Sequence, residues 1–557
     1  SDIAQMQVLL GIASRDGAKS VALVTDTGDY GSTFFDWFGF FATELGLTIT
    51  DVIRYDKTGA CEAPLQKALA KKPDVLFYVP GSAPTAGCAA RAVKDSGVKT
   101  RLLMPDGAQF TNLVEDGQDA AEGVEGTAPV SDPDSGFDQA YNARFGMAPP
   151  LLAAQSYDAA MLLAFGLQRS KGVTGAALAK GLKDVVSARG EKASWTLEGV
   201  QKVLSGIRSG NLVDIQGASG PLDYDSNAFT DVTSSVYGRW KVVNGAFQVQ
   251  EYFRTTRADG STESNVSVFR TEASNRVQQA LQDSSSYVPP ERRGLWAVVM
   301  ATSGGWDNYR HQADALAQYQ LLKARGVGDS RIVLILRDDL ANNPSNPEPG
   351  VVRNVAGGPN LYAGAQVDYA GSSIGPQQLL AILSGKKSAA LPVVVESTEN
   401  DNVFVFLVGH GGYQGVFLGS DKATYESGNF LAPRDLANTV KGMATNKAYR
   451  RMLVVIEACH GGTMGSDLPL APGALLISGA NAYESSRGAN YDASLRSWLG
   501  DEFAFKFWSL AQGTPDTKLA DAYVSLYKGV AGSHVTLYNM EGFSGVRTVA
   551  LSEFFTP

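Results

Sequence analysis

Two short glycine-rich segments in the C-terminal half contain the residue types that nucleophilic catalysis needs. His410 follows the apolar run 402–407, Cys459 follows the apolar run 452–456, and glycines come directly after His410 and shortly after Cys459. Runs of this kind predict buried parallel strands, and α/β sheets place their sites at the carboxyl ends of such strands. A cysteine attacks as the thiolate, a nearby imidazole can take its proton, and glycines let backbone amides approach a developing oxyanion. The two segments therefore predict a cysteine nucleophile paired with a histidine.

Strand and helix patterns alternate in both halves of the chain, which predicts α/β domains. In the first 150 residues the alternation predicts a parallel sheet with helices on both faces. Residues 151–210 are predicted to be mainly helical. The alternation restarts at 295–301 and continues to about 555. The predicted strands of the first half are 20–25, 48–54, 75–79, 102–104, 236–242 and 247–253.

A polar stretch separates the two halves. Residues 255–293 are rich in Ser, Thr, Asp and Arg and end in a proline pair followed by charged residues. This composition predicts a linker, with one short helix around 275–282. A chain of 557 residues is too long for a single core. The expected domains are therefore 1–254 and 294–557.

Composition narrows the class of protein. The chain is 44% hydrophobic and 19% charged, with a net charge of −9. The negative charge argues against nucleic acid or an anionic membrane surface as the main partner. No apolar run approaches the roughly 20 residues of a membrane span. The chain begins with Ser1 rather than Met, as expected of a trimmed protein.

The pairing of the three cysteines bears on the cellular compartment of the protein, because disulfides form in oxidising compartments. Cys61 and Cys88 flank one predicted strand and are candidates for a disulfide, which would imply an oxidising, periplasmic or extracellular setting. Two unpaired, partly buried thiols are the alternative. Cys459 is left over in either case. No His, Cys and acidic residues have the spacing of metal ligands, so neither a metal nor another cofactor is expected.

Residues 294–557 resemble the legumain (asparaginyl endopeptidase) family and its relative, the catalytic subunit of GPI-anchor transamidase. The resemblance implies a caspase-like fold, a mainly parallel sheet flanked by helices. Its motifs follow one another in the family order. They are Asn308-Tyr-Arg-His-Gln-Ala-Asp314, Arg337-Asp-Asp339, Asn343-Pro-Ser-Asn-Pro-Glu-Pro-Gly350, His410-Gly411, Glu457-Ala-Cys459, Glu484-Ser-Ser486 and Leu499-Gly-Asp501.

The resemblance implies roles for four residues of a catalytic centre. Cys459 would be the nucleophile and His410 the general acid and base. The region of Gly411 would supply an oxyanion donor, with the Cys459 amide as a second donor. Asn308 would position the imidazole, as third members do in other triads. A helix cap is the alternative role for Asn308.

The same resemblance implies a specificity pocket. A pocket that holds both a guanidinium and carboxylates suits a carboxamide, whose oxygen needs donors and whose nitrogen needs acceptors. Asn is therefore the expected residue before the cut bond, and Asp would be accepted only when protonated, at acid pH. An ordinary buried ion pair is the alternative reading. The implied pocket residues are Arg310, Glu457 and Asp501, with His311, Ser485 and Ser486 beside them.

Residues 1–254 resemble type I periplasmic binding proteins of the branched-chain amino acid kind, through 21–31, 157–160 and 220–225. The resemblance begins partway through the family pattern. Residues 1–150 would form the second lobe, and 151–210 the returning part of an incomplete first lobe with exposed apolar surface. A companion N-terminal chain completing that lobe is therefore expected. Ser82 and Asp106 are the candidate residues for a small ligand.

Together these features predict a secreted or periplasmic cysteine endopeptidase that cuts peptides or proteins after Asn through a thioester and processes its own chain. The binding-protein half would serve substrate docking, sensing or autoinhibition. A transamidase using the same acyl-enzyme is one alternative. An inactive peptidase fold acting as a sensor or scaffold is the other.

Overall fold

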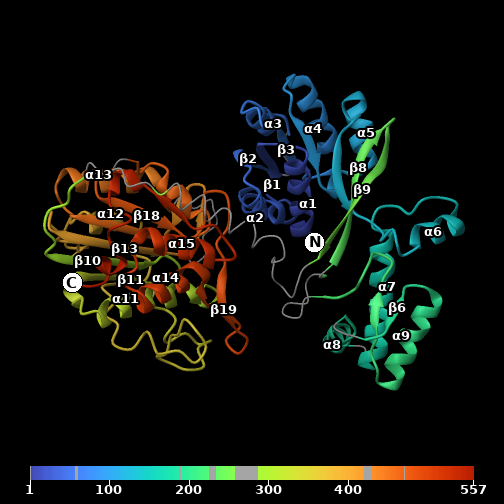
Figure 1. The fold of residues 1–557 in the computed structure, drawn as a ribbon. Coiled ribbons are helices and arrows are strands. Elements are labelled where there is room, and N and C mark those ends of the chain that lie inside the picture. Colours follow the sequence, from blue (N-terminus) through green and yellow to red (C-terminus); the bar gives the residue numbers. More distant parts are fainter. Residues whose placement is uncertain are drawn as a thin grey trace. The chain divides into compact units, whose positions relative to one another are not determined.

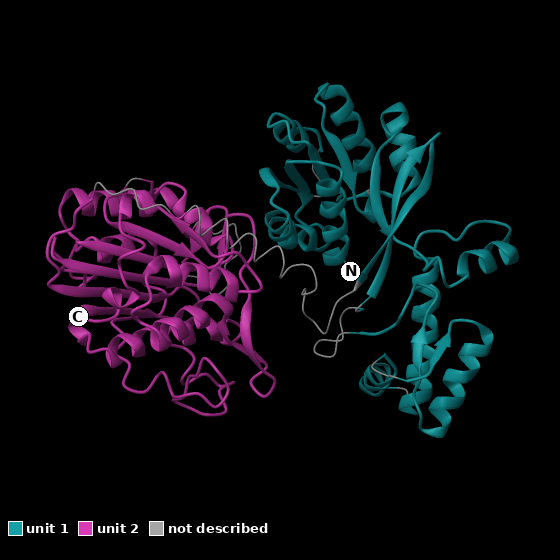
Figure 2. Cartoon of the chain, viewed as in Figure 1, with its two compact units in different colours: residues 1–269 teal, residues 270–557 magenta. Residues whose placement is uncertain are grey.

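The computed structural model divides into two compact units, residues 1–269 and residues 270–557 (Figure 2). The division falls inside the linker predicted at 255–293. The helix expected around 275–282 lies outside the described residues, apart from Leu281. The structure describes residues 2–56, 61–172, 174–186, 190–224, 232, 234–256, 281, 287–418, 429–469 and 471–557.

Unit 1 is built on a seven-stranded sheet with the strand order β2-β1-β3-β4-β5-β8-β9 (Figure 1). The pairs from β2 through β5 are parallel, whereas β8 joins β5 and β9 in antiparallel fashion. The strands are β1 (Ser20–Asp26), β2 (Thr48–Tyr55), β3 (Val75–Val79), β4 (Arg101–Met104), β5 (Glu125–Pro129), β8 (Ser234–Val243) and β9 (Ala246–Thr256).

Helices cover both faces of this sheet because successive strand side chains point in opposite directions. Val21 and Leu23 of β1 belong to a core with the first two helices, while Ala22 and Val24 belong to a core with the next three. The first pair is α1 (Asp2–Arg15) and α2 (Asp29–Glu44). The other three are α3 (Glu62–Leu69), α4 (Ala83–Ser96) and α5 (Thr111–Gly117).

A second group of helices in unit 1 has its own small core around Phe165, Val203 and Ile207. Leu163 and Leu167, one turn apart on α7, are 49% and 44% exposed. This is the kind of apolar surface that the family pattern predicts here, while the companion chain that would cover it stays a prediction. The group comprises α6 (Phe137–Phe145), α7 (Ala153–Ser170), α8 (Gly175–Val186), α9 (Leu197–Ser209) and the short parallel pair β6 (Lys192–Ser194) and β7 (Asp214–Gln216).

Unit 2 is built on a second seven-stranded sheet, in the order β12-β11-β10-β13-β17-β18-β21. All neighbours are parallel except β18 and β21, so the sheet is mainly parallel, as expected. The strands are β10 (Gly294–Ala301), β11 (Ile332–Leu336), β12 (Tyr369–Ala370), β13 (Asp401–Val408), β17 (Arg451–Glu457), β18 (Ala474–Ser478) and β21 (Thr536–Tyr538).

The helices of unit 2 also cover both faces of the sheet (Figure 1). Val299 and Phe404 pack toward α11 (Tyr309–Ala324), α14 (Glu502–Gly513) and α15 (Leu519–Gly529), and Val298 and Val405 pack toward α12 (Pro376–Leu383) and α13 (Pro433–Thr445). The remaining elements are a small sheet of β14 (Gly411–Gly412), β15 (Gly415–Phe417) and β16 (Phe430–Leu431), the hairpin of β19 (Gly488–Asp492) and β20 (Ser497–Asp501), and α16 (Met540–Phe543).

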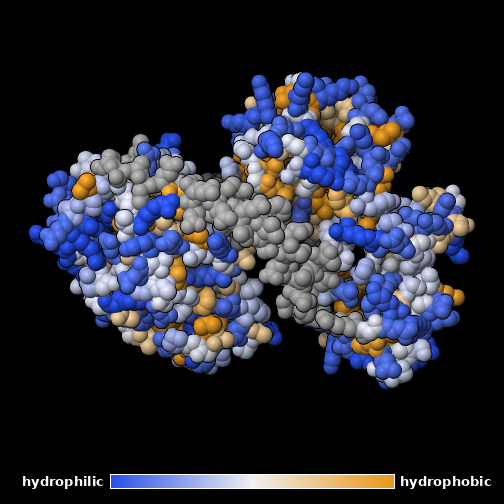
Figure 3. All heavy atoms as spheres, viewed as in Figure 1, coloured by the Kyte–Doolittle hydropathy of each residue, from blue (hydrophilic) through white to orange (hydrophobic). Residues whose placement is uncertain are grey.

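The surface seen in Figure 3 is mostly hydrophilic, with scattered apolar patches. None of the described helices combines the length and the apolar character needed to cross a bilayer.

Candidate active site

Strand register brings His410 and Cys459 to the same edge of the unit 2 sheet. Val408, which ends β13, pairs with Glu457, which ends β17, and the Gly409 amide donates to the Glu457 carbonyl at 3.0 Å. His410 and Cys459 each lie two residues beyond this pair. The structure thus places both at the carboxyl ends of adjacent parallel strands, where the sequence predicts them.

Gly411 allows the two segments to approach one another. A Cβ atom at this position would lie 2.2 Å from the Cys459 carbonyl oxygen and 2.9 Å from the Ala458 Cβ. Neither contact is sterically possible, so only glycine lets the backbone after His410 pass the backbone of the nucleophile. The role of Gly411 and the Cys459 amide as oxyanion donors stays a prediction.

Asn308 holds the His410 ring. Its Oδ1 lies 2.8 Å from His410 Nε2, and its Nδ2 donates to the Gly304 carbonyl at 2.8 Å. The second bond orients the amide, and because Oδ1 can only accept, Nε2 must carry a proton. Nδ1 is then the basic nitrogen of the neutral ring. The Asn308 side chain makes no capping bond to α11, so the geometry favours the positioning role over the helix cap.

The two residues of the predicted catalytic pair, His410 and Cys459, are both uncharged at neutral pH. Desolvation and the positive charge of Arg310 lower the pKa of His410 to about 4. Burial raises the pKa of the Cys459 thiol, against the opposing hydrogen bonds of Ser485 and Ser486. At neutral pH the site therefore contains a thiol and a neutral imidazole rather than a preformed ion pair, and the thiol must lose its proton when substrate is attacked.

The predicted pocket residues gather beside the nucleophile. Arg310, in the first turn of α11, donates through Nε to Asp501 Oδ1 at 2.8 Å, and Asp501 is 3% exposed. His311 is buried behind this pair, with Nε2 3.6 Å from Asp501 Oδ2 and Nδ1 hydrogen-bonded to the Ser303 hydroxyl. Burial, with Arg310 and His410 nearby, holds the pKa of His311 well below its usual range, so this ring is neutral.

Glu457 and the two serines, the other predicted pocket residues, also lie near Cys459 and Asp501. Glu457 is 1% exposed, and its Oε2 accepts the Ala504 amide at 3.0 Å. Burial and the charge of Asp501 raise its pKa well above the usual value, although a hydrogen bond from Ser486 opposes the rise. The Ser486 hydroxyl also lies 3.9 Å from Cys459 Sγ. Ser486 therefore lies next to both Cys459 and Glu457, between the predicted nucleophile and the predicted pocket residues.

Sequence reasoning missed Asp314, a further carboxyl group in this cluster. Asp314 is 1% exposed, and its Oδ2 accepts the Asp501 amide at 2.7 Å. One signal in the sequence points to it: Asp314 lies four residues after Arg310, on the same face of α11. A single sequence does not reveal that Asp501 meets this face.

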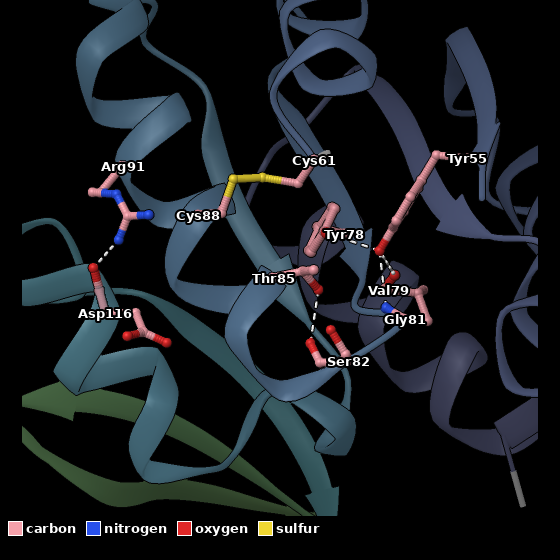
Figure 4. The surroundings of a disulfide bond; sticks show 10 residues. All are labelled: Tyr55, Cys61, Tyr78, Val79, Gly81, Ser82, Thr85, Cys88, Arg91 and Asp116. Atoms are coloured by element: carbon pink, nitrogen blue, oxygen red, sulfur yellow. Dashed lines mark hydrogen bonds between the residues drawn. A yellow bond between two sulfur atoms is a disulfide. The ribbon is translucent and has the colours of Figure 1, made fainter. Parts of the chain in front are cut away.

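The candidate ligand residues of unit 1, Ser82 and Asp106, follow β3 and β4, which are adjacent parallel strands. Ser82 precedes α4, and its carbonyl accepts the Thr85 hydroxyl at 2.7 Å (Figure 4). Asp106 Oδ1 accepts the Tyr30 hydroxyl at 2.8 Å. No hydrogen bond joins Ser82 to Asp106 among the described residues. Their role as ligand contacts stays a prediction.

Cys61 and Cys88 form a disulfide that joins the start of α3 to α4 (Figure 4). Within the described ranges, one group of potential metal ligands is close enough to share an ion: these two cysteines and Glu62. The disulfide engages both thiols, which leaves one carboxylate.

Each of the two units matches a known protein family. The sequence profile of the peptidase C13 family matches residues 295–553, and that of a periplasmic binding protein family matches residues 1–193. The C-terminal half is therefore a peptidase C13 domain, and the N-terminal half contains a domain of the periplasmic binding protein type.

The curated relatives of the C-terminal half are legumains. The chain is 34% identical to legumain of Rattus norvegicus over 267 residues, which cover 47% of this chain and 60% of the legumain. It is 38% identical to legumain of Canavalia ensiformis over 197 residues, which cover 35% of this chain and 40% of that protein. The chain thus spans at most about three fifths of the length of these two relatives.

Among solved structures, the chain is similar to a leucine-binding protein of Thermotoga maritima. The two are 23% identical with a TM-score of 0.37, and the match covers 46% of this chain and 66% of that one.

Proposed function

We propose that unit 2 is a cysteine endopeptidase that cleaves after Asn. The observation that carries the proposal is the ion pair between the partly exposed Arg310 and the buried Asp501, with Nε and Oδ1 2.8 Å apart, beside the Ser486 hydroxyl that lies 3.9 Å from Cys459 Sγ. A guanidinium supplies donors for a carboxamide oxygen, and a carboxylate supplies acceptors for a carboxamide nitrogen. A pocket with acidic residues alone would favour Lys or Arg instead.

The catalytic residues have matching roles in this proposal. Nδ1 of neutral His410 takes the proton of the Cys459 thiol while Sγ attacks the carbonyl carbon after Asn. The resulting imidazolium gives its proton to the leaving amine, which leaves a thioester on Cys459. Water then attacks the thioester, with His410 again acting as base. Asn308 accepts a hydrogen bond from His410 Nε2, which leaves Nδ1 as the nitrogen that exchanges protons with Cys459 and the leaving amine.

The charges of the pocket support a preference for a neutral side chain. The positive charge of Arg310 is matched by Asp501, while His311 is neutral and burial favours the neutral form of Glu457. A substrate Asp would bring an unmatched negative charge unless it is protonated. Cleavage after Asp is therefore expected only at acid pH.

Fluorogenic peptides that differ only in Asn, Asp, Arg or Lys before the reporter test the proposal. We expect release after Asn at neutral pH, its loss on thiol alkylation, and turnover reduced by about 10⁴-fold or more in Cys459→Ala, which keeps peptide affinity. Release from Arg or Lys would overturn the pocket assignment, and an active Cys459→Ala variant would overturn the mechanism.

A transamidase is the second candidate, because it proceeds through the same thioester. Adding a nucleophilic amine to the Asn peptide separates the two activities by mass spectrometry. Hydrolysis as the main product supports the endopeptidase, whereas an amide adduct formed in preference to the acid supports the transamidase.

For the whole chain we propose a periplasmic or extracellular protein, on the basis of the binding-protein domain in unit 1 and the Cys61–Cys88 disulfide. Unit 1 would dock substrates, sense a ligand or restrain the peptidase. Self-processing and a companion N-terminal chain are further proposals that the same preparation would reveal as additional polypeptides in its mass spectrum.

A further inference from the structure

Three buried carboxyl groups and one partly exposed guanidinium lie close together in unit 2. Asp314 and Glu457 are 1% exposed and Asp501 is 3% exposed, while Arg310 is the cation bonded within the group. Full ionisation would leave two unmatched negative charges away from water, which a protein interior does not tolerate. Protonation of two of the three carboxyl groups removes this imbalance.

Hydrogen bonds indicate which carboxyl group stays ionised. Asp501 accepts from Arg310 Nε at 2.8 Å through Oδ1, a contact that favours its charged form. Among the described residues no ion pair joins Asp314 to a cation, and its Oδ2 accepts the Asp501 amide at 2.7 Å. Burial and the charge of Asp501 raise the pKa of Asp314 well above its usual value.

The two remaining oxygens of this pair fit one shared proton. Among the described residues, neither Asp314 Oδ1 nor Asp501 Oδ2 has a conventional hydrogen-bond partner, and both are buried. The Asp314 carboxyl group lies against the backbone of Asp501, with Oδ2 2.7 Å from the Asp501 amide, whereas His311 Nε2 is 3.6 Å from Asp501 Oδ2, beyond hydrogen-bonding distance. A proton on Asp314 would satisfy both oxygens, because a protonated carboxyl group donates to a carboxylate.

The backbone geometry makes Asp314 a natural support for Asp501. A Cβ at Gly500 would lie 2.9 Å from Asp314 Oδ1, so the carboxyl group rests directly against the Gly500–Asp501 peptide. It therefore contacts the end of β20 through both the Asp501 amide and the glycine before it. Movement of Asp314 would move the carboxylate that Arg310 needs.

We propose that Asp314 is a neutral carboxylic acid that positions Asp501, so that the specificity pocket contains a single matched pair of charges. The inference rests on the proposed function and adds a residue to it: Asp314 acts through Asp501 rather than by touching substrate. Because Asp314 is neutral, it leaves the charge of Arg310 matched by Asp501 alone, and Asp501 keeps the orientation in which it can accept from a carboxamide nitrogen.

Two substitutions of similar size test the role. Asp314→Asn keeps an oxygen for the Asp501 amide and an N–H donor for the Asp501 carboxylate, whereas Asp314→Leu keeps neither. We expect Asp314→Asn to retain kcat/KM on the Asn peptide within about threefold with an unchanged pH profile, and Asp314→Leu to lose about 30-fold or more, mainly through KM. Asp401→Asn is the matched control for replacing a buried carboxyl group, because Asp401 is 7% exposed and begins β13 at the opposite end from His410.

Two outcomes would overturn the proposal. If Asp314 is ionised, Asp314→Asn removes a negative charge from the pocket, shifts the pH profile and raises Asp cleavage relative to Asn cleavage by about tenfold or more. If Asp314 only stabilises the fold, both variants lower the melting temperature and leave KM unchanged. Should Asp314→Leu fail to fold, the profile of Asp314→Asn decides alone.

An infrared measurement separates this inference from the proposed function. The difference spectrum of wild type minus Asp314→Asn at neutral pH should contain a carboxylic acid C=O band if Asp314 is protonated, and a carboxylate band if it is ionised. This readout needs no turnover. A wild-type protein that cleaves none of the peptides would refute the proposed function, while the carboxylic acid band would still report on the charge of Asp314.

Discussion

At the scale of single residues, Arg310 takes part in both the proposed pocket and the electrostatics of the proposed catalytic pair. Its guanidinium binds Asp501, desolvation together with its charge lowers the pKa of His410, and Cys459 in turn raises the pKa of Arg310. The cation that would recognise the substrate amide therefore also keeps the catalytic base in its neutral, proton-accepting form.

The pKa of His410 predicts an enzyme that tolerates acid. His410 must be neutral to act as a base, and its pKa is lowered to about 4. The acid limb of kcat/KM on the Asn peptide should therefore fall near this pH rather than near the ordinary histidine value of about 6.5. Asn308→Asp places an anion against Nε2, which stabilises the imidazolium and should move the acid limb upward by about one pH unit.

Asn308→Ala provides the comparison for this titration. It removes the acceptor for Nε2 without adding charge, so we expect kcat to fall by about tenfold or more with little change in KM. An acid limb near pH 6.5 that neither substitution moves would contradict the assignment of the limb to His410.

At the scale of elements, the parallel pairing of β13 and β17 creates the site, and Gly411 sets how closely the two strand ends approach. Gly411→Ala would place a methyl group 2.2 Å from the Cys459 carbonyl oxygen. Relieving this clash moves the His410 segment away from the nucleophile, so kcat/KM should fall by about 100-fold or more while the domain stays folded.

Gly442→Ala is the matched control for that substitution. Gly442 lies within α13, and a Cβ there would meet no atom within 4 Å. Alanine should raise the stability of unit 2 by about 0.5–1 kcal/mol and leave the kinetics unchanged. Equal activity of the two variants, with both proteins folded by circular dichroism, would show that the strand ends tolerate separation.

At the scale of the whole molecule, the chain comprises two compact units with separate cores, so damage to one unit should not spread to the other. The disulfide of unit 1 offers a direct test, because it closes a loop of 27 residues between α3 and α4. Replacing both Cys61 and Cys88 with Ser should destabilise unit 1 by about 3–4 kcal/mol.

Calorimetry and peptide kinetics on the same double variant check this independence. The unfolding transition of unit 1 should move to lower temperature, while that of unit 2 and the cleavage of short peptides stay as in the wild type. A parallel loss of both would mean that the units stabilise one another.

The sequence by itself predicts several of the core strands and the family of the C-terminal half. Apolar runs and their spacing predict β3, β10, β13 and β17 within one residue at each end, because buried parallel strands need continuous apolar side chains. Motif order predicts which of the residues around Cys459 form the site. His410 and Cys459 follow β13 and β17, two adjacent parallel strands, so the linear pattern already predicts that these two residues lie at one edge of the sheet.

Only the tertiary structure decided how the pocket charges are matched. Asp314 and Asp501 are 187 positions apart, and nothing in the local pattern of α11 shows that the end of β20 packs on it. The orientation of the Asn308 amide likewise depends on Gly304, which lies outside the motif. Protonation and positioning depend on distances and burial between distant segments, which one sequence does not contain, whereas strands and motifs depend on residues that are neighbours in the chain.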